Sequence, residues 1–183
     1  MEIKIFYTIV HLLGVAIGAG GAFMSDVMFM SSISDNKINH TEYRFMKIGS
    51  IFVWLGLIIL LISGGLLFST DPGTYLESDK FMSKITVILF LLINGVVFHK
   101  YHMPIIHKHK NHKFNSLDHF KKERFWLVIS GVVSVVSWTF ALVLGAWRGI
   151  PFSYLQIMFV YFACITTGII VGRIIFKKKF SLL

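Results

Sequence analysis

Five residues early in the chain have types and spacing that suit either a ligand site or a close contact between helices. His11, Gly14, Gly18, Gly21 and Ser25 are separated by three, four, three and four positions, so on a helix they lie along one face. A row of small residues lets a second helix or a flat ligand approach the backbone closely. His11 is the one side chain of this stripe that can coordinate a metal. The stripe is therefore either a packing seam or a binding site.

The stripe belongs to a chain with the composition of a membrane protein. Hydrophobic residues make up 55% of the 183 residues, and the mean hydropathy is +0.72. A soluble domain of this size has too little interior for so many apolar side chains, so we expect the fold to be surrounded by lipid. Charged residues are only 15% of the chain and form short clusters between apolar runs. We interpret the net charge of +9 as a topology signal and expect no nucleic acid partner.

Five apolar segments are long enough to span a bilayer, at about 20 residues each. They lie near 5–30, 46–68, 81–101, 125–147 and 152–176. We see no internal repeat and no low-complexity linker, so the sequence predicts one all-α transmembrane domain over residues 1–183. The predicted architecture is a bundle of five helices.

The connections between the segments predict the orientation of the bundle. Of the 18 Lys and Arg residues, most lie in 31–47, 99–124 and 173–179. Those on the other side of the predicted membrane are Lys4, Lys80, Lys84 and Arg148. By the positive-inside rule we expect the N-terminus outside and the C-terminus in the cytoplasm. We assign the chain to the bacterial cytoplasmic (inner) membrane as a multi-pass protein.

His11 is the residue of the first segment that we interpret as a metal ligand. It lies roughly 10 Å below the outer boundary, and ionisable groups at such depth are costly and usually functional. Neutral imidazole binds haem iron axially, and the glycines make room for a porphyrin face. The alternative is a neutral imidazole that is hydrogen-bonded to a neighbouring helix. Segments 46–68, 125–147 and 152–176 contain no histidine, so we expect no second axial histidine at this depth.

Lys84 and Asp26 are charged side chains inside predicted membrane segments. Lys84 is about one turn into the third segment, where it either contacts a carboxylate of a bound ligand or extends to the lipid headgroups. Asp26 lies near the cytoplasmic end of the first segment. We interpret Asp26 as a structural ion-pair partner of Arg44 or Lys47.

A second group of histidines follows the third segment. His99 and His102 are three positions apart, a helical spacing that presents two imidazoles to one metal, and copper is the alternative to haem as a ligand of this chain. Lysines alternate with histidines in 107–112, which favours a solvated basic loop beside lipid headgroups over a metal site. A metal site in this region is therefore expected at His99 and His102.

Several short motifs occur together in residues 5–105. They are His11-Leu-Leu-Gly14, Gly21-Ala-Phe, Glu42-Tyr-Arg44-Phe-Met, Gly56-Leu, Gly64-Gly65 and a third segment with Lys84 and His99. This part of the chain resembles small bacterial membrane proteins of the membrane-type protoporphyrinogen oxidase and copper-resistance-D-like group. The resemblance implies a haem-associated membrane bundle, with haem b on the first-helix histidine, which is His11 here.

Two functions of different class follow from these patterns. The first is haem b binding at His11 in the groove of Gly14, Gly18 and Gly21, with a redox or electron-transfer role; an enzyme of this kind is a haem-dependent oxidoreductase. The second is a non-enzymatic membrane subunit or small transporter. In that case the small-residue stripes of the first, fourth and fifth segments are packing surfaces, including contacts in a homodimer or larger membrane complex.

Overall fold

The computed structural model describes residues 2–34, 38–111 and 118–180, with side chains in these ranges except at 33–34, 118–124 and 176–180. The described residues form helices without any strand. The helices are α1 (Glu2–Ser34), α2 (His40–Ser69), α3 (Pro72–Leu76), α4 (Asp79–Val97), a π-helical turn (Phe98–His102), α5 (Met103–His109), α6 (Asp118–Ala146) and α7 (Tyr154–Phe180). Five stretches of the described chain are long and apolar enough to cross a membrane. The predicted number of membrane-spanning segments, five, is confirmed by the length and composition of these helices.

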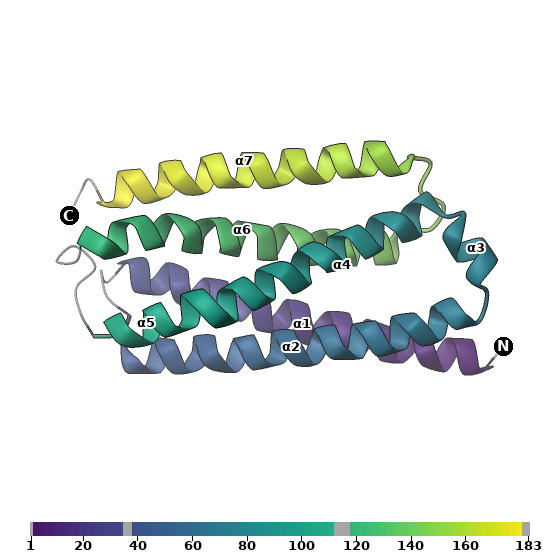
Figure 1. Cartoon of the computed structure of the whole chain (residues 1–183), viewed down its shortest axis with the longest axis horizontal. Helices are drawn as coiled ribbons and strands as arrows, with labels where there is room; N and C mark the ends of the chain where they lie inside the picture. Colours follow the sequence, from purple (N-terminus) through teal and green to yellow (C-terminus); the bar gives the residue numbers. More distant parts are fainter. Residues whose placement is uncertain (1, 35–37, 112–117, 181–183) are drawn as a thin grey trace.

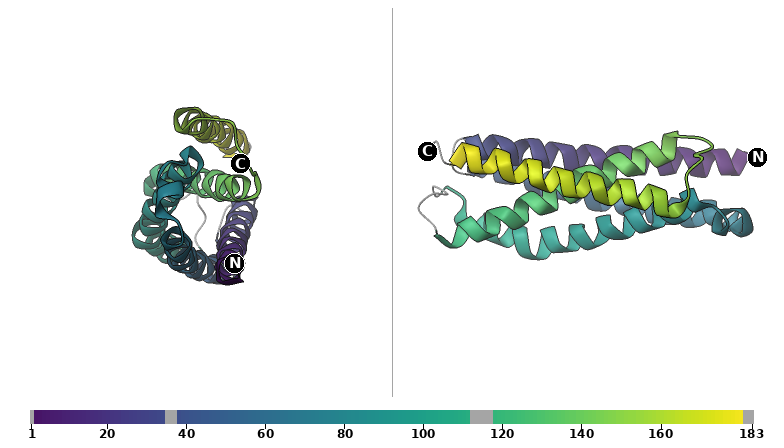
Figure 2. Two further views of the ribbon diagram at one scale, coloured as in Figure 1. Left: turned by 90° about the vertical axis from the view of Figure 1, so that its right-hand side faces the viewer. Right: turned by 90° about the horizontal axis from the view of Figure 1, so that it is seen from above.

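The long helices run alternately up and down, so that the connections alternate between the two ends of the bundle (Figure 1). The start of α1, the short α3 and the connection between α6 and α7 lie at one end. The ends of α1, α5 and α7 lie at the other. Figure 2 shows α1, α2, α4 and α6 arranged around a common axis, with α7 placed outside against the α4 and α6 side.

The helices extend beyond the apolar segments from which they were predicted. The second segment was expected at 46–68, but α2 already begins at His40. A capping box explains the earlier start, because the Asn39 side chain accepts from the Glu42 N–H at 2.9 Å and the Glu42 carboxylate accepts from the Asn39 N–H at 2.9 Å. The third span likewise continues through the π-helical turn to His109. Hydropathy locates the lipid-facing part of a helix, whereas polar caps set its ends.

Helices α1 and α2 pack so closely that their backbones are in contact. A Cβ atom added at Gly56 would lie 2.5 Å from both N and Cα of Gly18. A Cβ at Gly21 would lie 2.7 Å from the Gly49 carbonyl oxygen, and one at Gly14 would lie 2.8 Å from the Ile59 side chain. The glycine stripe of the first segment is therefore the seam along which α2 packs.

The other side of the bundle is held by side-chain contacts between α4, α6 and α7. The Ser137 and Tyr161 hydroxyls are hydrogen-bonded at 2.7 Å, and the Tyr161 side chain is fully buried. The Thr86 and Tyr154 hydroxyls are hydrogen-bonded at 3.1 Å between α4 and α7. Further along α7, Gly168 faces the side chain of Val132 on α6. The small-residue face predicted for the fifth segment thus packs on the fourth.

Candidate functional site

His11 is held by a hydrogen bond from α1 to α2. Its Nδ1 lies 3.0 Å from the Oγ of Ser63, and that hydroxyl donates its own proton to the Ile59 carbonyl oxygen at 2.6 Å. The hydroxyl can therefore only accept from His11, which assigns the proton of the neutral ring to Nδ1 and leaves a lone pair on Nε2. The sequence allows two interpretations of His11, a metal ligand and a neutral imidazole hydrogen-bonded to a neighbouring helix. The structure contains the hydrogen bond of the second interpretation.

Lys84 of α4 is the charged group that acts on the His11 ring across the bundle. Lys84 on α4 is partly buried and interacts electrostatically with the His11 ring. The ring itself lies against α2, because a Cβ added at Gly64 would be 3.5 Å from His11 Cε1. His11 and Lys84 thus share the half of the bundle that contains the start of α1.

The groove beside His11 does not fit a porphyrin. Gly14 and Gly21 face the backbone and side chains of α2, and a Cβ at Gly18 would lie 2.1 Å from the Trp138 ring. A planar cofactor at these glycines would have to displace both a helix and a buried indole. Haem at His11 stays a prediction, and the described geometry gives it no room along the stripe.

An absorption spectrum tests the haem prediction directly. Because α2 and Trp138 fill the stripe, we expect protein purified from haem-replete cells to show no Soret band, and His11→Ala to leave the spectrum unchanged. Free haem added in equimolar amount serves as the control for detection. A Soret band that His11→Ala removes would contradict this expectation and establish the haem site.

The second predicted metal pair is separated by the local helix geometry. His99 and His102 lie in the π-helical turn, and the His99 side chain is exposed whereas His102 is buried. A π turn is wider than an α turn, so residues three apart no longer share a face. Within the described ranges no cluster of three or more His, Cys, Asp or Glu residues is placed to hold a metal ion. His112 lies outside the described residues, and copper at His99 and His102 stays a prediction.

Asp26 occupies a position that the sequence interpretation did not foresee. It was expected to pair with Arg44 or Lys47, but both of these side chains are exposed, whereas Asp26 borders an internal cavity. Its Oδ2 atom is buried and has no hydrogen-bond partner among the residues that the structure describes. The predicted ion pair is therefore not formed. A buried carboxyl oxygen without a partner is costly, which marks Asp26 as a functional candidate.

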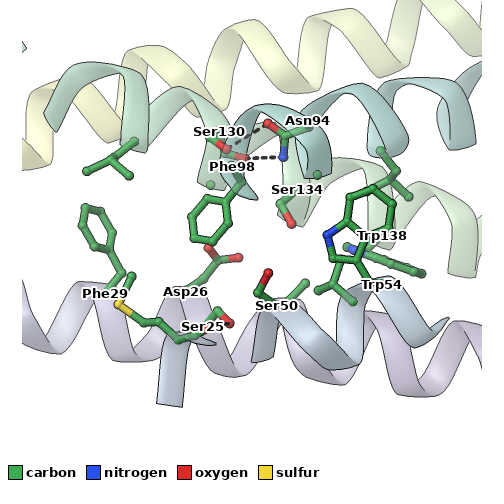
Figure 3. A pocket seen from close by; sticks show the side chains of 17 residues that line it. Ser25, Asp26, Phe29, Ser50, Trp54, Asn94, Phe98, Ser130, Ser134 and Trp138 are labelled. Carbon is green, nitrogen blue, oxygen red and sulfur yellow. Dashed lines mark hydrogen bonds between the residues drawn. The ribbon is translucent and has the colours of Figure 1, made fainter. Parts of the chain in front are cut away.

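Polar groups from four helices surround the cavity of about 50 Å³ beside Asp26 (Figure 3). Figure 3 shows the Asp26 carboxyl and the hydroxyls of Ser50 and Ser134 pointing into the same space. Asn94 of α4 lies above them, fixed by two hydrogen bonds to Ser130 of α6: Asn94 Nδ2 donates to the Ser130 carbonyl at 3.0 Å, and Ser130 Oγ donates to Asn94 Oδ1 at 2.9 Å. The volume suits a few water molecules or a small cation.

Aromatic rings complete the wall of this cavity. They are contributed by Phe29, Trp54, Phe98 and Trp138. None of the 17 described residues that line the cavity is Lys, Arg or His, so the Asp26 carboxyl is the charged group of the lining. A carboxylate, oxygen ligands and ring faces together attract positive charge. We define this group of residues around Asp26 as the Asp26 cavity.

The sequence contained a signal for the Asp26 cavity that the interpretation did not use. Asp26 interrupts an apolar segment, Asn94 does the same in the third segment, and Ser130 and Ser134 form a polar stripe in the fourth. We assessed each polar residue only within its own segment. The cavity forms because the fold brings these residues of different helices together.

Comparison with protein-family models, with curated proteins and with solved structures gives no match. The resemblance to the membrane-type protoporphyrinogen oxidase and copper-resistance-D-like group stays a prediction.

Proposed function

We propose that this protein is a small multi-pass membrane transporter in which Asp26 binds a cation on its way through the bundle. The observation that carries the proposal is the buried Asp26 Oδ2, which has no hydrogen-bond partner in the described part of the chain and borders a cavity lined by hydroxyl, amide and aromatic groups. Ionisable side chains are costly inside a membrane and are retained mainly where they bind ions, protons or substrates.

A purely structural role for Asp26 has little support in its surroundings. A structural carboxylate would be neutralised by a basic side chain or satisfied by donors at both oxygens. The lining of the Asp26 cavity supplies no basic group among its described residues. Since the glycine stripe is filled by α2 and Trp138, the small-residue surfaces serve packing, as the transporter hypothesis expects.

The proposed orientation is an N-terminus outside and a C-terminus in the cytoplasm of a bacterial inner membrane. Helix α5, which contains Lys108, and the start of α2, which contains Arg44 and Lys47, lie at the same end of the bundle (Figure 1). The positive-inside rule assigns this end to the cytoplasm. Asp26 is eight residues from the end of α1 at Ser34, which corresponds to about 12 Å of helix from the cytoplasmic end.

Ion flux into proteoliposomes tests the proposal. Purified protein is reconstituted in phosphatidylethanolamine and phosphatidylglycerol, and a potassium diffusion potential drives cations inward. Trapped pyranine reports protons in one arm, and radiolabelled sodium reports Na⁺ in the other. We expect wild-type protein to give a flux in one arm, and Asp26→Asn to reduce it to the rate of protein-free liposomes, because the amide cannot carry the negative charge that attracts the cation.

Asp79→Asn is the matched control, since Asp79 is exposed at the start of α4. It should retain the wild-type flux. Equal fluxes in wild type and Asp26→Asn, or wild-type fluxes no higher than those of protein-free liposomes in both arms, would overturn the proposal.

A further inference from the structure

A second cavity adjoins the Asp26 cavity on its α6 and α7 side. It is an apolar groove of about 260 Å³ between α1, α6 and α7, lined for example by Val132, Val135 and Gly168. Val135 and other rim residues, Met30 and Ile175, are exposed, so the groove opens to the outside of the bundle. We call it the lateral groove.

The lateral groove and the Asp26 cavity share part of their walls. Asp26, Phe29, Leu127 and Gly131 line both. Gly131 stands directly against the carboxyl, because a Cβ atom added there would lie 3.3 Å from Asp26 Oδ1. A side chain larger than hydrogen at this position would therefore fill the space beside the carboxyl.

We propose that the lateral groove and Asp26 together bind an amphipathic organic cation, with its alkyl chain in the groove and its ammonium group at the Asp26 carboxyl. This inference rests on the proposed function and names the substrate class of the same site. The ligand reaches Asp26 from the lipid through the groove, past Gly131.

Three observations select this class of ligand over lipid alone. Among the described residues, the groove wall is apolar except for Asp26, which suits an alkyl chain that ends at a carboxylate. The rings of Phe29 and Phe98 line the same cavity as that carboxylate, and ring faces attract alkylammonium groups as well as apolar chains. The volume of about 260 Å³ is just below the usual range of small-molecule pockets, about 300–1,000 Å³. A zwitterionic or anionic lipid would bring a phosphate next to the carboxylate, which like-charge repulsion disfavours.

Binding of radiolabelled octyltrimethylammonium to the protein in lipid nanodiscs tests the inference by scintillation proximity, with empty nanodiscs as background. We expect saturable binding to wild type. Asp26→Asn should weaken it by about tenfold or more, since it removes the charge-assisted contact. Val135→Phe should weaken it similarly by filling the groove away from the carboxyl. Val143→Phe is the matched control, because Val143 is exposed on the same helix and lines neither cavity.

The outcomes separate this inference from the transporter proposal. Unsaturable binding, unchanged binding to Val135→Phe, or equal competition by the neutral isostere with a tert-butyl head group would overturn the inference. Loss of ammonium binding beside an intact Asp26-dependent proton or Na⁺ flux would leave the transporter standing without this substrate. Asp26-dependent binding without flux in either arm would overturn the transporter proposal and leave a binding site for amphipathic cations at Asp26.

Discussion

Gly56→Leu is expected to prevent α1 and α2 from packing and to leave little folded protein. A Cβ at this position would lie 2.5 Å from the Gly18 backbone and 2.7 Å from the Gly14 carbonyl oxygen, and backbone atoms cannot move aside as a side chain end can. Overpacking of a core costs typically 1–3 kcal/mol and occasionally more, and this contact should cost about 3 kcal/mol or more. The measurement is the midpoint of thermal unfolding in detergent, followed by size-exclusion chromatography with fluorescence detection.

Gly20→Leu is the control for this substitution. Gly20 lies on the same helix as the stripe, and a Cβ added there would meet nothing within 4 Å. It should fold and elute like wild type. Equal midpoints for Gly56→Leu and wild type would show that the two backbones are not in contact, and the description of the seam would be wrong.

The second large effect is expected for Trp138→Ala. The Trp138 side chain is fully buried, packs on Gly18 of α1 and forms one wall of the Asp26 cavity. Truncation of a buried Trp or Phe to alanine costs about 3–5 kcal/mol, because the transfer free energy is lost and a void remains. We expect a lower midpoint of thermal unfolding. Trp147→Ala, at a tryptophan that is 47% exposed, should change the midpoint little.

Trp138→Phe distinguishes the contribution of ring packing on Gly18 from the contribution of the indole Nε1–H group. The Trp138 Nε1 is buried and has no hydrogen-bond partner within the described ranges. Phenylalanine keeps most of the ring contact with Gly18 and removes this unsatisfied donor, so the two effects oppose each other. The midpoint should therefore lie well above that of Trp138→Ala. A midpoint as low as that of Trp138→Ala would contradict the role of ring packing at Gly18.

The number of spans could be predicted from the sequence because hydropathy acts over whole helices. Each apolar run is long enough to cross a bilayer by itself, and no tertiary contact is needed to recognise it. The ends of the helices were less predictable. The capping box at Asn39 and Glu42 and the π-helical turn at Phe98–His102 both extend helices past their apolar parts. Such features depend on local hydrogen bonds that hydropathy does not measure.

The candidate site could be predicted only in part. The spacing of Gly14, Gly18 and Gly21 identified a face for close approach, but the same spacing accommodates a helix or a flat ligand, and only the location of α2 and Trp138 distinguishes them. Asp26 was recognised as a charged residue within the membrane, yet its surroundings come from other helices. Sequence spacing within one helix carries no information about them.

The reciprocal hydrogen bonds between Asn94 and Ser130 have a mechanical consequence. Together with the Ser137–Tyr161 pair they tie α4, α6 and α7 into one block. The backbone contact at Gly18 and Gly56 makes α1 and α2 a second block. Asp26 of the second block faces Gly131 of the first, so a small movement of one block against the other would change the space beside the carboxyl without unfolding a single turn.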